Sequence, residues 1–160
     1  MVEKIKKICF DIATLGGIGE IPAGGLVATL VSVPLLFILK AFSWLGPTFF
    51  ALLVILITVF VLSVIHLALH YQTDKDSSVI VIDRLFGCLI VFLSIPISIK
   101  VLVIGFLLFN FFNFLSPFLW YKLGNINLEE LPGVLGIIAS DLVVGVVLNI
   151  LFRLILWIAR

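Results

Sequence analysis

The sequence predicts an all-α membrane protein, a polytopic bundle of four to five apolar helices whose polar residues gather at a cytoplasmic-side face. Three observations lead to this class. Of 160 residues, 63% are hydrophobic and only 12% are charged; the mean hydropathy is +1.39; and long apolar runs recur along the chain. One small soluble core cannot bury so much apolar surface, so lipid must solvate much of it. No strand-like alternation competes with helices.

Five apolar runs are candidate membrane spans, because a helix needs about 20 apolar residues to cross the bilayer core. In chain order they are residues 25–39, 49–70, 79–99, 101–121 and 134–158. Lys40 ends the first run and Lys100 separates the third from the fourth. Polar segments 72–78 and 122–130 separate the others. We expect residues 1–160 to form a single membrane domain.

The basic N-terminus favours a cytoplasmic start, because cytoplasmic segments carry the excess of Lys and Arg. Lys4, Lys6 and Lys7 supply this charge, and the Gly-rich stretch after them is unlike the apolar core of a cleaved signal peptide. With five spans, four polar segments would share the cytoplasmic face: residues 11–25, 72–84, 110–122 and 132–141. Removing one span would divide these residues between two faces.

Composition and spacing argue against several kinds of site. The net charge of +1 and the absence of a basic stripe exclude nucleic-acid binding, and no protein partner is indicated. Cys9 and Cys88 have no metal-binding spacing, so we expect free thiols. His66 and His70 have the i, i+4 spacing that can bind a transition metal. They lack the HExxH motif, and we favour interfacial histidines.

Ionisable residues within apolar runs are costly and tend to be functional. Asp83, Arg84 and Asp141 are such residues. In one interpretation, Asp83 pairs with Arg84 near the interface and Asp141 caps a helix start. In the other, Asp76, Asp83 and Asp141 hold Mg²⁺, which prefers carboxylate oxygens together with substrate phosphate. The spacing leaves both interpretations open.

The Gly-rich segment 16–25 interrupts helix formation before the first apolar run. Its last residues, Gly24 and Gly25, would present backbone N–H groups to a phosphate at the next helix N-terminus. The segment lacks the GK[ST] ending of a P-loop and no strand precedes it. A re-entrant or interfacial turn is the alternative.

The order of these motifs resembles the phosphatidylglycerophosphatase A family over most of the chain. The resemblance includes the Gly-rich segment, D-x6-D followed by a glycine, a Phe-rich run before a proline, and G-I-x3-D. The matching positions are Pro22, Asp76, Asp83, Gly87, Pro96, Phe109, Pro117, Gly136, Asp141 and Gly145. The resemblance implies a magnesium-dependent phosphatase of the bacterial inner membrane. Such an enzyme converts the membrane lipid phosphatidylglycerophosphate to phosphatidylglycerol during phospholipid biosynthesis.

The chain departs from the family pattern at charged positions. Asp83-Arg84 stands where the family has Asp-Glu, and Ser140-Asp141 where it has Asp-Asp. Three further polar residues, Asn110, Asn113 and Ser116, occupy the region where the family has an Arg, an Asp and a Lys-Pro. These differences remove both carboxylate ligands and phosphate-binding cations, on which phosphoryl transfer depends.

The resemblance implies catalytic roles for Asp83 and Asp141, which with Asp76 would hold Mg²⁺. Arg84 would bind phosphate together with Gly24 and Gly25. One alternative is an inactive homologue that binds lipid or a protein partner, with Arg84 paired to Asp83 in the vacated metal site. Another is a small transporter or channel subunit, in which Asp83, Arg84 and Asp141 line a polar path.

Overall fold

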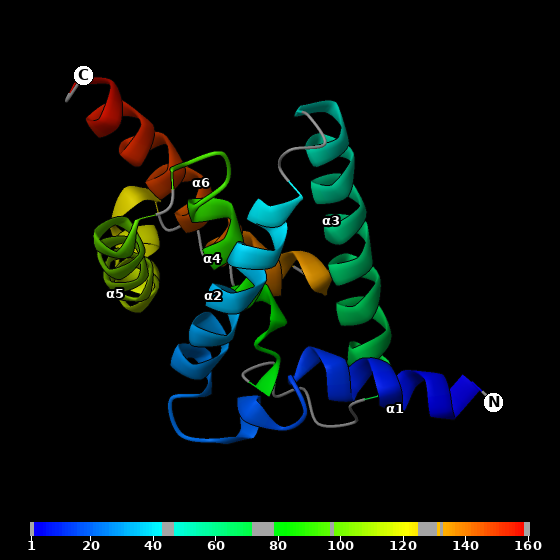
Figure 1. Ribbon diagram of the computed structural model, residues 1–160. Coiled ribbons are helices and arrows are strands. Elements are labelled where there is room, and N and C mark those ends of the chain that lie inside the picture. Colours follow the sequence, from blue (N-terminus) through cyan, green and yellow to red (C-terminus); the bar gives the residue numbers. More distant parts are fainter. Residues whose placement is uncertain are drawn as a thin grey trace. The chain divides into compact units, whose positions relative to one another are not determined.

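The computed structural model describes residues 2–42, 47–71, 79–96, 98–124, 131 and 133–158. In these residues the protein is all-helical, with six α-helices, one short 3-10 helix and no strand (Figure 1). The prediction of an all-α fold is therefore confirmed. The chain divides into two compact units, residues 1–85 and 86–160, and each is described by itself.

The first unit holds α1 (Val2–Ala13), η1 (Ile18–Glu20), α2 (Gly24–Ala41), α3 (Pro47–Leu69) and the start of α4 (Ile82–Val91). Helix α1 packs against α3 and crosses its C-terminal end (Figure 1). Phe10 of α1 contacts Tyr71 there, with ring centroids 5.6 Å apart. The helix was not predicted from the sequence.

The second unit holds the rest of α4, α5 (Ile99–Gly124) and α6 (Val134–Ile158). Helices α5 and α6 pack against each other. At Gly105 of α5, a Cβ atom would lie 2.6 Å from Cε1 of Phe92 and 3.4 Å from Cε2 of Phe152. Aromatic side chains thus fill the space that this glycine leaves.

Among the described residues, four helical segments are long and apolar enough to cross a membrane: Gly24–Ala41, Leu52–Leu69, Ile99–Phe118 and Val134–Ile158. At most 39% of the residues in each are buried. Large apolar side chains point outward, among them Leu56 at 67% and Phe114 at 84% exposure. A surface of this kind requires lipid as its solvent, so the chain is a multi-pass membrane protein.

The predicted span over residues 79–99 is wrong. Helix α4 has only 10 residues, about 15 Å of helix against a hydrocarbon core of about 30 Å. The chain turns after α4, because Ser94 adopts a left-handed conformation with φ 60° and Pro96 lacks an N–H for a continuing helix. The sequence argument for one shared cytoplasmic face required five spans, so it no longer holds once the span over residues 79–99 is removed.

Candidate functional site

The Gly-rich segment is a compact turn between α1 and α2. The Oγ1 of Thr14 donates a hydrogen bond to the carbonyl oxygen of Asp11 and accepts one from the N–H of Gly17, both at 3.2 Å. Gly16 and Gly17 are left-handed, with φ of 69° and 91°. Residues with a Cβ adopt this conformation at a cost, which explains glycine at both positions. The sequence therefore sets the path of this turn locally.

The turn contacts the chain that leads into α4. The N–H of Val81 donates a 3.0 Å hydrogen bond to the carbonyl oxygen of Ala13. Gly19 packs directly against the backbone of Val79, because a Cβ on Gly19 would lie 2.7 Å from the carbonyl carbon of Val79. The Gly-rich segment and the start of α4, far apart in the sequence, are thereby held together within the first unit.

Arg84 completes this junction, because its side chain lies on Gly25 in the first turn of α2. A Cβ on Gly25 would come 2.7 Å from Cδ and 2.8 Å from Cζ of Arg84. The N–H of neighbouring Gly24 donates to the carbonyl oxygen of Ile21 at 2.9 Å. Within the described ranges, the Gly25 N–H has no hydrogen-bond acceptor.

Two positively polarised groups therefore lie side by side. A helix N-terminus carries a partial positive charge on its free N–H groups, and the guanidinium of Arg84 carries a full one. Arg84 is exposed, and no carboxylate of the described residues forms an ion pair with it. This arrangement favours an anion, and it brings together three predicted phosphate-binding residues: Arg84, Gly24 and Gly25.

Two of the predicted carboxylates are buried. Asp83, in the first turn of α4, is 7% exposed, and Asp141, in α6, is 4% exposed. Asp76 lies outside the described residues. Among the residues that are described, no group of three or more His, Cys, Asp or Glu side chains could hold a metal ion.

His66 and His70 lie one helical turn apart at the C-terminal end of α3, with ring centroids 4.6 Å apart. Both are exposed. The Nδ1 of His70 donates a 2.8 Å hydrogen bond to the carbonyl oxygen of His66, which ties one ring nitrogen to the helix end. The free thiols of Cys9 and Cys88 are as expected.

Asp141 lies at the contact between α6 and α4, where the backbones of the two helices approach closely. A Cβ on Gly87 would lie 2.7 Å from the carbonyl oxygen of Asp141 and 2.9 Å from Cζ of Phe109. A Cβ on Gly145, one turn after Asp141, would lie 2.5 Å from the carbonyl oxygen of Gly87. Small residues allow such close approach of membrane helices. Four positions of the family resemblance thus meet at one point of the second unit.

Asn149 and Arg153 were missed by the sequence analysis. The Nδ2 of Asn149 lies 2.9 to 3.1 Å from three carbonyl oxygens at the C-terminal end of α4, those of Ile90, Val91 and Leu93. Its Oδ1 accepts a 2.8 Å hydrogen bond from Nε of Arg153, whose Nη2 donates to Leu93 at 3.1 Å. Their spacing in the sequence could have identified them, because positions 141, 145, 149 and 153 lie four residues apart and form one stripe of small or polar residues along α6.

Helix α5 carries amides where the family resemblance leads one to expect charges. The Nδ2 of Asn110 donates a 2.8 Å hydrogen bond to the carbonyl oxygen of Phe106. Both amide atoms of Asn113 are buried and have no hydrogen-bond partner within the part of the chain that is described. These residues supply no ionic group for a phosphate or a metal.

Comparison with known protein families identifies a match over most of the chain. A family model described as Phosphatidylglycerophosphatase A matches residues 12–156, a range that extends over both compact units. No curated protein and no solved structure matches the chain significantly.

Proposed function

The chain belongs to the phosphatidylglycerophosphatase A family, and from this premise we propose that it is a lipid phosphatase of the bacterial inner membrane. Its substrate is phosphatidylglycerophosphate, whose terminal phosphate is hydrolysed at the cytoplasmic face to give phosphatidylglycerol for phospholipid biosynthesis. The observation that carries this proposal is the position of Arg84 on Gly25, at the N-terminus of α2.

This position suits the phosphate of a lipid headgroup. A guanidinium presents paired N–H groups that match two phosphate oxygens, and the first turn of a helix offers backbone N–H groups with a favourable dipole. In the first turn of α2 the N–H groups of Gly24, Leu26 and Val27 donate to carbonyl oxygens of Ile21 and Ala23, whereas the Gly25 N–H has no acceptor among the described residues. Arg84 is exposed, so a headgroup can reach it without rearrangement of the helices.

Asp83 and Asp141 are the proposed catalytic carboxylates and magnesium ligands, with Asp76 as the third. Both described carboxylates are buried, and ionised groups at such sites are retained when a cation or hydrogen bonds compensate them. Carboxylate oxygens are the ligand type that Mg²⁺ prefers, with one or two carboxylates binding the ion together with substrate phosphate. When bound, the ion would neutralise charge that develops on the phosphoryl oxygens.

The direct test is phosphate release from phosphatidylglycerophosphate by the purified full-length protein in detergent, with magnesium and with chelator. We expect magnesium-dependent release that is lost in Asp83→Asn and in Asp141→Asn. Asp11→Asn is the matched control, because Asp11 is exposed on α1 and has no proposed role. Arg84→Lys should retain part of the release that Arg84→Gln loses, since lysine keeps the charge but not the paired N–H groups.

A catalytically silent homologue is the second candidate, favoured by the uncharged residues at Asn110, Asn113 and Ser140. It would bind the lipid or a protein partner without hydrolysis. Folded protein that binds phosphatidylglycerophosphate but releases no phosphate would support this candidate and contradict the enzyme. Solute flux across vesicles that Asp141→Ala abolishes, without phosphate release, would instead indicate the transporter.

A further inference from the structure

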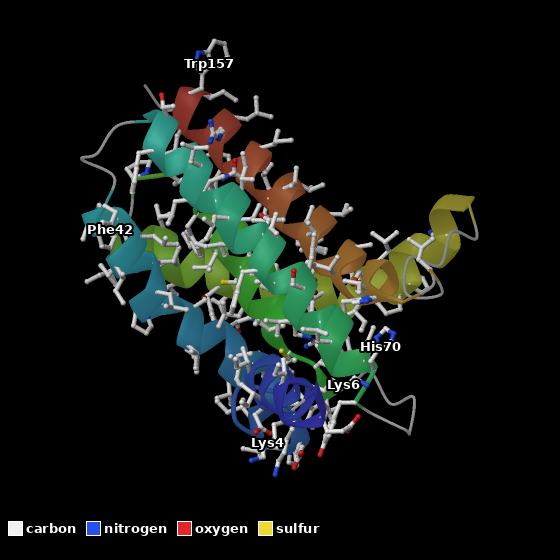
Figure 2. The ribbon with its side chains drawn as sticks, turned by 90° about the vertical axis from the view of Figure 1, so that its right-hand side faces the viewer. Lys4, Lys6, Phe42, His70 and Trp157 are labelled. Atoms are coloured by element: carbon white, nitrogen blue, oxygen red, sulfur yellow. The ribbon has the colours of Figure 1, made fainter. Side chains whose placement is uncertain are left out.

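Helix α1 has an unusual place and composition for this chain. It has 12 residues, about 18 Å, too few to cross a bilayer. It packs at the C-terminal end of α3, a candidate span, where Phe10 meets Tyr71. In Figure 2, Lys4 and Lys6 extend from α1 at the same end of the first unit as His70, whereas Phe42 lies at the far end of α2. The helix therefore lies where a span leaves the bilayer.

The surface of α1 carries an apolar stripe beside a basic one. Ile5, Ile8 and Ile12 follow helical spacing and are 48%, 56% and 37% exposed. Lys4 and Lys7 are exposed on the adjoining face. In a soluble protein this isoleucine stripe would be an unexplained apolar surface. At the end of a membrane span, such a stripe suits the region between headgroups and acyl chains.

We propose that α1 is an interfacial helix that docks on the anionic lipid surface of the same bilayer. The isoleucine stripe enters the acyl boundary, and Lys4 and Lys7 contact negatively charged headgroups. Lys6 has a different role, because its Nζ lies 3.5 Å from Oε1 of Glu3. The proposal goes beyond the phosphatase function and does not depend on it.

Two observations favour lipid over a second copy of the chain. The apolar stripe adjoins lysines, which suit anionic headgroups and are depleted in the cores of protein interfaces. Exposed apolar residues also follow α1 in the chain, because Ile21 of the Gly-rich segment is 54% exposed and Leu26 at the start of α2 is 44% exposed. Helix α2 is itself a candidate span, so the chain after α1 leads into a helix suited to lipid.

The test measures the depth of single fluorescent probes in the full-length protein. Cys9→Ser removes the half-buried thiol. The Cys9→Ser protein without an introduced cysteine is treated with the probe in the same way, and it reports any reaction of Cys88, which is 1% exposed. An environment-sensitive probe is attached at Ile8→Cys or, as the matched control on the polar face, at Asp11→Cys. Each protein is reconstituted in phosphatidylcholine vesicles with and without phosphatidylserine, an anionic lipid that is not the proposed product.

We expect brominated lipid to quench the probe at position 8 and aqueous iodide to quench the probe at position 11. Phosphatidylserine should increase the quenching by lipid at position 8. The double variant Lys4→Gln/Lys7→Gln should lack this increase. Each substitution should lower the equilibrium constant for docking on the anionic surface by about fivefold. Both lysines are exposed, so folding should be retained.

Three results would overturn the proposal. Equal iodide quenching at both positions would show that the isoleucine stripe faces water. Protection from iodide without quenching by lipid would show that protein, such as a second copy, covers the stripe. Lipid quenching that does not respond to phosphatidylserine would exclude the role of the two lysines. None of these results depends on phosphatase activity.

Discussion

Substitution of Gly25 by alanine separates phosphate binding from stability. A Cβ at this position would lie 2.7 Å from Cδ and 2.8 Å from Cζ of Arg84, whereas ordinary contact is 3.4–4 Å. The Arg84 side chain must therefore retreat by about 1 Å, more than a charge-assisted hydrogen bond tolerates without loss of geometry. We expect Gly25→Ala to disturb the proposed phosphate contact specifically.

The size of the effect follows from the contact that is lost. Hydrogen bonds to a charged group contribute about 1.5–3 kcal/mol, so KM for phosphatidylglycerophosphate should rise by roughly 10- to 100-fold. The free energy of unfolding should change little. Arg84 is exposed, so its side chain can move toward solvent, and alanine is favoured over glycine in a helix by up to about 1 kcal/mol.

The assays are phosphate release across a substrate range and thermal unfolding in detergent. Arg84→Gln supplies the second arm of a double-mutant cycle with Gly25→Ala. If the alanine acts by displacing Arg84, then the double variant should be no worse than Arg84→Gln alone. Additive losses, or a Gly25→Ala protein with unchanged KM, would refute the reasoning. A large fall in the unfolding temperature of Gly25→Ala would refute the claim that the Arg84 side chain moves aside at little cost.

Three further substitutions test the packing of each unit by thermal unfolding. Gly19→Ala should lower the free energy of unfolding by about 1–3 kcal/mol, because its Cβ would meet the backbone of Val79, which cannot move aside as the Arg84 side chain can. If the Gly19→Ala and Gly25→Ala proteins were equally stable, this prediction would be wrong. Asn149→Leu should cost about 1–3 kcal/mol by leaving the α4 carbonyl oxygens without their side-chain donor, and a neutral result would mean that Arg153 suffices. Gly145→Ala should cost about 1–3 kcal/mol, since its Cβ would lie 2.5 Å from the Gly87 carbonyl oxygen; Val146→Ala, at an exposed neighbour, is the control.

Helix α1 could have been predicted from the sequence. Ile5, Ile8 and Ile12 have the spacing of an amphipathic helix. A search for runs of about 20 apolar residues cannot find such a segment, because its polar face keeps the average hydropathy low. The lysines were used only as a signal of orientation. Their spacing relative to the isoleucines carried the structural information.

The end of α4 shows the opposite situation. Residues 79–99 are apolar enough to suggest a span, yet the helix has ended by Val91. Proline at position 96 was visible in the sequence. The carbonyl oxygens after position 89 find donors in Asn149 and Arg153, nearly 60 residues away. Hydropathy averages a local window and cannot report a partner so distant in the chain.

The amino-acid pattern alone is enough to predict that lipid is the solvent and to predict much of the local conformation. Four of the five predicted apolar runs correspond to described helices long enough to span a bilayer, and the predicted break in helix at the Gly-rich segment includes the left-handed residues Gly16 and Gly17. Motif order also pointed to the family that residues 12–156 match. The contacts between distant residues could be found only from the packed helices: Arg84 lies against Gly25, and Gly145 lies against Gly87. Hydropathy and backbone propensity act between near neighbours, whereas these contacts depend on how separate helices pack, which no local pattern encodes.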